Sequence, residues 1–287
     1  MGSFGRSTTA SSRGRCLIVI PEGEAGQTER AMKTDHPAEI VKHVETARAK
    51  LTVTLRCTGV RNDGYHLIDA EMVSLDLADS LTFTTAPDTA LTLSSDANAA
   101  RGLPVTLAAD NLVARALARL HRTAHVHIDK RIPAGGGLGG GSADAAAVYR
   151  WAGRTSDADV IESANLGADV AFCIRGGRAR VTGIGELLEP LPFVTRTFTL
   201  LTPPFGVSTP AVYRAWDTLG GPTADGSNDL EPAAISVEPR LQEWRDRLGE
   251  IAGRTPTLAG SGSTWFVEGA FEGPDLVVVH TVRQMVE

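Results

Sequence analysis

The sequence predicts an α+β fold, and three observations carry this prediction. Apolar residues alternate around Val53-Thr54-Leu55, as in a half-buried strand, and a strong hairpin signal follows at Asn62-Asp63-Gly64. Residues 111–120 carry Leu112, Ala116 and Leu120 at helical spacing. Strands and helices are mixed along the chain without a regular strand–helix–strand period, and we find no internal repeat. This order favours α+β over a doubly wound sheet.

The remaining elements follow from the same patterns. In the first half we expect strands at 72–77, 80–85, 90–94 and 126–128. Two helices are expected next, at 143–152 and 157–165. A strand at 197–202 opens a second region, which adds a helix at 239–251 and strands at 265–267 and 276–280.

Composition excludes several classes of protein. The chain has 287 residues, 28 Lys+Arg against 34 Asp+Glu and a net charge of −6. This length suggests one or two domains that need no disulfide or metal to stabilise the core. No apolar run approaches the roughly 18–20 residues of a membrane span, and no basic block indicates a nucleic-acid or membrane partner. Cys16, Cys57 and Cys173 are widely spaced, as expected for isolated thiols in a reducing compartment.

The first 31 residues differ from the rest. Residues 1–21 contain three arginines (Arg6, Arg13, Arg15) and many Ser and Thr, and no acidic residue occurs before Glu22. Such a segment is either an organelle transit peptide, or a disordered tail, or the result of a start assigned upstream of Met32. No amphipathic stripe supports a transit peptide, so we expect a partly disordered extension over 1–46 and a cytoplasmic protein.

The glycines concentrate in one loop. The segment is Pro133-Ala134-Gly135-Gly136-Gly137-Leu138-Gly139-Gly140-Gly141-Ser142-Ala143. Six glycines in seven positions let a ligand approach the backbone closely, and the alanine-rich run that follows favours a helix with Ser142 as its N-cap. Free N–H groups that lead into a helix N-terminus bind anions. The loop therefore predicts a nucleotide-phosphate site.

Two other phosphate loops fit less well. A Walker A loop needs Lys before the Ser or Thr, and Gly141 stands there. Gly135, Gly137 and Gly140 match G-x-G-x-x-G, the dinucleotide fingerprint of dehydrogenases, but the loop lies mid-chain and lacks the acidic residue about 20 positions on. A dehydrogenase therefore stays an alternative on this pattern alone.

At these residues the chain resembles the GHMP kinase superfamily, whose second motif has this form. Further blocks follow in the family's order. They are Ala49-Lys50-Leu51, Asp63-Gly64-Tyr65-His66-Leu67, Asp110-Asn111-Leu112-Val113, Leu166-Gly167-Ala168-Asp169-Val170, Ser227-Asn228-Asp229-Leu230-Glu231 and Gly260-Ser261-Gly262. The resemblance implies a ribosomal-protein-S5-like domain over 47–192 and an abbreviated ferredoxin-like domain over 193–287. It also implies an ATP-dependent small-molecule kinase, active as a monomer or homodimer.

The resemblance also implies roles for individual residues. Taken alone, Lys50 reads as a surface lysine and Asp169 as a helix cap; by resemblance they are the catalytic pair. ATP is expected on Pro133–Ala143 with Asn111 and Lys130 near its adenine and ribose, and Mg²⁺ on its phosphates with Ser142 as the protein contact. The residues expected to hold the acceptor, a cytidine-diphosphate-linked polyol, are Tyr65, His66, Thr209, Tyr213, Gly260, Ser261 and Gly262. His36, His43, His121, His125, His127 and His280 show no metal-ligand spacing.

Three features depart from the family pattern. Thr52 stands where Asn is usual, the stretch before Leu166 is short, and the chain ends soon after the third motif. Two alternatives therefore stay open beside the leading interpretation. One is a GHMP-type kinase of another small alcohol, such as a sugar, a mevalonate-like or an amino-acid alcohol. The other is a catalytically degenerate nucleotide-binding relative.

Overall fold

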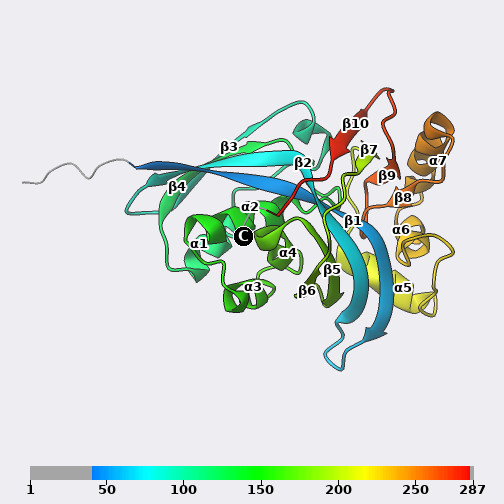
Figure 1. The fold of residues 1–287 in the computed structure, drawn as a ribbon, viewed down its shortest axis with the longest axis horizontal. Helices are drawn as coiled ribbons and strands as arrows, with labels where there is room; N and C mark the ends of the chain where they lie inside the picture. The colour runs from blue at the N-terminus through cyan, green and yellow to red at the C-terminus, as the bar shows by residue number, and fades with distance from the viewer. Residues whose placement is uncertain (1–40, 285–287) are drawn as a thin grey trace, which may run out of the picture. The chain divides into compact units, whose positions relative to one another are not determined.

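Two β-sheets organise the residues that the computed structural model describes, 41–284 (Figure 1). These residues belong to a single unit, 40–287. The mixed helices and strands confirm the predicted α+β class. The expectations for a transit peptide, for a start at Met32, and for Cys16 and His36 lie outside the described residues.

The larger sheet is built around one long strand. Its members are β1 (Lys42–Val60), β2 (His66–Thr85), β3 (Ala90–Ser95), β4 (Ala124–Lys130), β5 (Arg178–Gly183) and β6 (Leu187–Pro190). β1 pairs antiparallel with the whole of β2. β5 pairs with the first half of β2 and β4 with its last six residues, while β3 runs parallel to β4 and β6 pairs with β5. Residues 42–46, expected in the extension, thus form the start of β1.

Helices gather against this sheet, and a smaller sheet follows. The helices of the first part are α1 (Leu112–Arg119), α2 (Gly140–Trp151), α3 (Asp157–Ser163) and α4 (Val170–Arg175), with a 3₁₀ turn at Ala99–Arg101. The smaller sheet has the order β10 (Leu276–His280), β7 (Thr197–Leu201), β9 (Trp265–Glu268), β8 (Thr257–Leu258). The same part of the chain adds α5 (Thr209–Thr218), α6 (Glu231–Val237) and α7 (Leu241–Ala252). Of these helices, α7 contacts β9, and α5 packs against α6. None of the helices within 41–284 is long and apolar enough to cross a bilayer.

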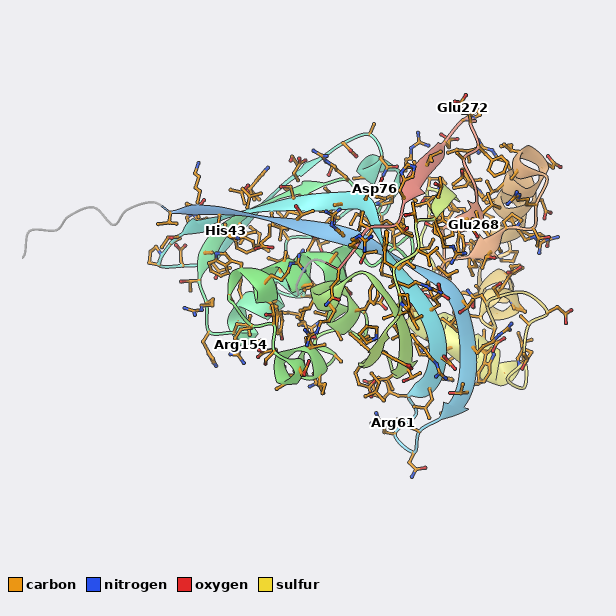
Figure 2. The ribbon with its side chains drawn as sticks, in the orientation of Figure 1. His43, Arg61, Asp76, Arg154, Glu268 and Glu272 are labelled. Carbon is orange, nitrogen blue, oxygen red and sulfur yellow. The ribbon has the colours of Figure 1, made fainter. Side chains whose placement is uncertain are left out.

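The predicted hairpin is present, but the two strands expected after it are one. The turn between β1 and β2 closes with Arg61 N–H donating to the Tyr65 carbonyl at 2.8 Å, and Gly64 has φ +86°. Arg61 lies at the tip of the hairpin (Figure 2). The expectation of separate strands at 72–77 and 80–85 is wrong, because β2 runs unbroken through Asp79. In the sequence, the polar Asp79 interrupts the strand pattern. In the structure it is buried, and its carboxylate is paired with the ammonium of Lys130.

Helix α2 lies closest to the large sheet, because its residues are small. Ala143, Ala145, Ala146 and Ala147 are buried almost completely, and α2 contacts β1, where Ala47 and Ala49 are equally buried. Small side chains on both elements let the two backbones approach closely. The alanine run is therefore a packing surface as well as a good helix former, and it fixes the position of the glycine loop that precedes it.

The sequence patterns miss several short elements. These are α4, α5, α6, β5, β6 and β8. Helix α5 carries Pro210 in its first turn and only Val212 and Trp216 as buried residues, so its apolar pattern is sparse. Short strands such as β8, of two residues, are held by pairing with β9 rather than by their own sequence.

A buried charge cluster joins β2, β4 and α2. The ammonium of Lys130 donates to Asp79 at 2.5 Å and to Asp144 at 2.8 Å, and Asp79 also accepts from the backbone N–H groups of Arg131 and Ile132. Burial disfavours the ammonium, but Asp144 and Asp79 hold the pKa of Lys130 above its usual value. Burial raises the pKa of Asp144 to about 7, against the opposing effect of Lys130.

This cluster predicts a pH-dependent stability. The pKa of Asp144 in the folded protein lies above its unfolded value of 3.8. The protonated carboxyl therefore stabilises the folded state fully below pH 3.8, and this stabilisation is lost as pH rises toward about 7. Asp144→Asn does not titrate at this position, and we expect the wild type to lose stability relative to this variant between about pH 4 and 7. Urea midpoints across that range measure the difference. Asp157→Asn, on a side chain that is 93% exposed, is the control, and parallel pH curves for wild type and Asp144→Asn would contradict the assignment.

Candidate active site

The glycine loop is held between β1 and the turn formed by Gly260, Ser261 and Gly262. Lys50 N–H donates to the Leu138 carbonyl at 3.0 Å, and Thr264 N–H donates to the Gly136 carbonyl at 3.1 Å. Gly137 has φ +77°, and a Cβ there would meet the carbonyl of Ala259 and, at 2.7 Å, that of Gly262. No side chain fits at this point of the loop.

The loop enters α2 earlier than the sequence predicts. α2 begins at Gly140, with Gly139 (φ +70°) in the left-handed conformation as its N-cap. Ser142 is therefore in the first turn and not the N-cap, contrary to expectation. The glycine at 139 is required because a Cβ there would meet Cγ of Lys50 at 2.8 Å. The backbone N–H groups of the first turn stay available for an anion, since the first N–H groups of a helix have no intrahelical partner.

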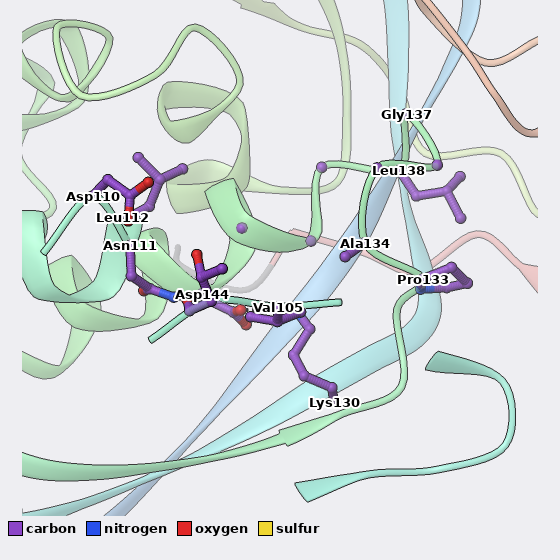
Figure 3. A pocket seen from close by; sticks show the side chains of 16 residues that line it. Val105, Asp110, Asn111, Leu112, Lys130, Pro133, Ala134, Gly137, Leu138 and Asp144 are labelled. Carbon is purple, nitrogen blue, oxygen red and sulfur yellow. Dashed lines mark hydrogen bonds and ion pairs between the residues drawn. The ribbon is translucent and has the colours of Figure 1, made fainter. Parts of the chain in front are cut away.

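A hollow of about 260 Å³ opens on one side of the loop (Figure 3). Asn111 and Lys130 line it as expected, together with Asp110 and Asp144. The side chain of Asn111 caps α1, accepting from Val113 N–H at 2.9 Å and donating to the Thr106 carbonyl at 2.8 Å. Lys130 is already engaged by its two carboxylates. Both residues therefore shape this hollow with side chains that have partners of their own.

A second, larger hollow of about 690 Å³ is lined by five of the same glycines. It is lined by Ser142 and by all the expected acceptor residues except Gly262. Its polar lining includes Lys50, Thr52, Tyr65, His66, Ser142, Asp169, Thr209, Tyr213, Arg214, Asp217, Gly260 and Ser261. Gly262 does not line it but fixes the turn against the loop. The two hollows share Leu112 and five glycines of the loop, so they adjoin each other along it.

Lys50 and Asp169 meet beside the loop. Lys50 Nζ lies 3.2 Å from Asp169 Oδ2 and donates to Thr52 Oγ1 at 3.1 Å. The Lys50 side chain is 6% exposed, so its interpretation as a surface lysine is wrong, whereas that of Asp169 is 29% exposed and reaches the hollow. Asp169 occupies the N-cap position of α4 but makes no capping hydrogen bond with its side chain. Its carboxylate is therefore directed to Lys50 and the hollow.

Aromatic side chains gather at the far end of the larger hollow. His66 stacks on Tyr213 with ring centroids 4.6 Å apart, and Trp216 meets His66 edge-on at 5.6 Å. His66 Nε2 also lies 2.7 Å from Asp217 Oδ1. Tyr65 stands apart from this stack: it is 58% exposed, with the Arg61 guanidinium 5.9 Å from its ring centroid.

Sequence reasoning missed Trp216, Asp217 and Arg214. The three residues follow Tyr213 on α5, and Asp217 lies four residues after it, on the same helix face. That spacing is the signal that could have found Asp217, had the helix been expected. Burial, reinforced by Cys57 and Asp169, raises the pKa of the Tyr213 hydroxyl well above its usual value, so the ring stays neutral.

Asn228 anchors the turn that closes the site. It is 1% exposed, and its amide donates to the carbonyls of Leu258 and Gly260 at 2.8 and 2.7 Å while accepting from Leu230 N–H. Thr209 and Ser261 share a 2.7 Å hydrogen bond that ties α5 to the same turn. The third motif is thereby fixed to α5 and to the segment before α6.

The donor groups at the site suit a magnesium ion held mainly by phosphates. No group of three or more His, Cys, Asp or Glu within residues 41–284 is arranged to hold a metal. Ser142 offers one hydroxyl in the larger hollow. Mg²⁺ commonly keeps several waters and takes phosphate oxygens as ligands, so a set of protein ligands this sparse fits it.

Comparisons with known proteins agree with this geometry. The sequence profile described as GHMP kinases N terminal domain matches residues 111–177. The 4-diphosphocytidyl-2-C-methyl-D-erythritol kinase of Paracoccus denitrificans is 38% identical over 77% of this chain and 85% of its own length. The enzyme of that name from Nitrobacter hamburgensis is 35% identical, over 83% and 90% of the two chains.

A solved structure shows the same fold. The crystal structure of 4-(cytidine 5'-diphospho)-2C-methyl-D-erythritol kinase superposes with a TM-score of 0.61 at 28% identity, covering 83% of this chain and 98% of the other. These matches confirm the resemblance read from the motifs and do not support the dehydrogenase alternative. The chain belongs to the GHMP kinases and, among them, to the 4-diphosphocytidyl-2-C-methyl-D-erythritol kinase family.

Proposed function

We propose that this protein transfers the γ-phosphoryl group of ATP to the 2-hydroxyl of 4-diphosphocytidyl-2-C-methyl-D-erythritol, a step of the non-mevalonate isoprenoid pathway. The observation that carries the proposal is the Lys50–Asp169 pair, 3.2 Å apart, beside the glycine loop at one end of a hollow with an aromatic stack at the other. Family membership supports both the reaction and the acceptor.

Asp169 accepts the proton of the acceptor hydroxyl. The hydroxyl oxygen then forms a bond to the γ-phosphorus as the bond to the β–γ bridging oxygen breaks, and ADP leaves. Lys50 stabilises the carboxylate and the negative charge that develops on the attacking oxygen. The low exposure of the Lys50 side chain strengthens this effect, because little water screens it.

The glycine loop holds the phosphates of ATP. N–H groups of Gly135 to Gly141 and of the first turn of α2 supply donors without a charged surface. Adenine and ribose occupy the smaller hollow, which Asn111 and Lys130 shape. Ser142 contributes one oxygen toward Mg²⁺, whose charge offsets that of the phosphates when it is bound.

The aromatic end of the larger hollow takes the cytosine. Tyr213 supplies a half-buried ring for stacking, and His66, fixed by Asp217, presents its imidazole beside that ring. Tyr65 lines the same end, while Thr209 and the turn at Gly260, Ser261 and Gly262 enclose the polyol.

We also propose the organisation and setting of the enzyme. Because the first sheet begins at Lys42, the nucleotide domain spans 42–192 and the acceptor domain 193–287, each built on one sheet. The free thiols of Cys57 and Cys173 suit a reducing compartment, and we propose the cytoplasm. Its partners are small molecules, and it acts as a monomer or homodimer.

Asp169→Asn tests the assigned chemistry. Loss of the proton acceptor should lower kcat by about 10²–10⁴-fold, the usual contribution of general base catalysis, while ATP binding is retained. Coupled detection of ADP measures turnover, and the thermal shift on adding Mg·ATP measures binding. Asp157→Asn, on an exposed helix start, should behave as wild type. Full turnover in Asp169→Asn would overturn Asp169 as the general base, whereas ATP binding without turnover in the wild type would leave a catalytically degenerate nucleotide-binding protein.

The acceptor is tested at Tyr213. Tyr213→Ala should raise KM for the cytidine-linked acceptor about 5- to 150-fold, since base stacking contributes about 1–3 kcal/mol, and leave KM for ATP unchanged. Tyr213→Phe keeps the ring and should bind normally. Equal turnover of a sugar, mevalonate-like or amino-acid alcohol by the wild type would overturn the acceptor and favour a different GHMP-type kinase.

A further inference from the structure

Three arginines from distant parts of the sequence line a hollow that the proposed reaction does not use. Arg48 comes from β1, Arg150 from the last turn of α2, and Arg283 from the segment after β10. The hollow has a volume of about 710 Å³ and is completed by Thr46 and Thr155 among others. Figure 1 shows the segment after β10, in red, returning to the large sheet, where Gln284 bridges to Gly176 at the end of α4.

Positive charge exceeds negative charge around this hollow. Glu45 is the only acidic residue in the lining, against three guanidinium groups. Arg48 has no ion pair within residues 41–284, and its Nε is a buried donor that finds no acceptor there. A buried donor without an acceptor destabilises the folded protein, so the site gains stability when an acceptor enters.

Arg150 is held rigidly at the wall of the same hollow. It donates to Glu45 at 3.2 Å and to the carbonyls of Cys173 and Thr46 at 2.9 and 2.7 Å. Burial lowers the pKa of its guanidinium, Glu45 opposes that shift, and the nearby charge of Arg48 adds to it. Arg283 is exposed, with its Cζ 4.5 Å from the Phe193 ring centroid. Arg150 is thus fixed beside the charge of Arg48.

We propose that this arginine hollow is a second anion site, which binds a phosphate or diphosphate group bearing at least two negative charges. Guanidinium groups present paired N–H donors that match phosphate oxygens, and the hydroxyls of Thr46 and Thr155 add neutral donors. Three arginines and one glutamate leave a charge of about +2 to be balanced, which suits a dianion better than a single carboxylate.

The site is separate from the nucleotide site. Gly140 and Arg150 lie at opposite ends of α2, about 15 Å apart along its axis at 1.5 Å per residue. The arginine hollow shares no residue with either hollow beside the glycine loop. The anion that it binds is therefore additional to ATP and to the acceptor.

Calorimetric titration of the full chain with inorganic pyrophosphate, in metal-free buffer with saturating ADP, tests the proposal. We expect binding to persist in ADP, and both Arg48→Gln and Arg283→Gln to weaken it about tenfold or more, as loss of a charged hydrogen bond implies. Arg122→Gln removes the same charge from an exposed turn and should leave the affinity unchanged. Thermal unfolding of each variant checks that it folds. If Arg48→Gln does not fold, Arg283→Gln alone still tests the site.

Each outcome separates this proposal from the kinase proposal. Absence of pyrophosphate binding in ADP, or equal binding by wild type and both arginine variants, overturns the second anion site. If Arg122→Gln weakens pyrophosphate binding equally, the binding reflects net charge alone, and the second anion site is also overturned. Failure of the chain to bind ADP counts against the kinase proposal instead. In that case, weaker pyrophosphate binding by the arginine variants than by the wild type still tests the second site.

Discussion

The close fit of the glycine loop between Lys50 and the turn at Gly260–Gly262 is the constraint on which the site depends. The loop hydrogen-bonds to β1 on one side and to Thr264 on the other, and Gly137 leaves no room for a Cβ. One short segment therefore joins both sheets, begins α2 and lines both hollows. Displacing it would move the phosphates, the Lys50–Asp169 pair and the third motif relative to each other.

Much of the fold could be predicted, because its longer elements carry their own periodicity. α1, α2, α7 and the strands β3, β4, β7, β9 and β10 lie close to their expected ranges. The continuity of β2 could not be predicted: Asp79 is polar in sequence and becomes buried only because Lys130, 51 residues away, pairs with it. α5 and β8 are likewise defined by what they pack against.

The site was predictable in its residues and less so in their surroundings. The motifs selected Lys50 and Asp169, but no local pattern shows that Lys50 is buried or that Thr52 accepts its hydrogen bond. The stack of His66 on Tyr213 joins residues 147 positions apart and involves Asp217, which belongs to no motif. Such pairs arise from tertiary packing. The arginine hollow is the same case, since three separate segments supply its charges.

Substitution of Gly137 by alanine tests the central constraint most directly. Gly253→Ala is the matched control, because Gly253 shares a positive φ (+62° against +77°) but has no atom within 4 Å of an added Cβ. We predict that Gly137→Ala lowers kcat/KM for ATP by about 10²-fold or more, since misplacing reacting groups by about 1 Å has that effect. Gly253→Ala should cost only the backbone strain of about 1–2 kcal/mol in stability. A wild-type kcat/KM for ATP in a folded Gly137→Ala variant would contradict the account.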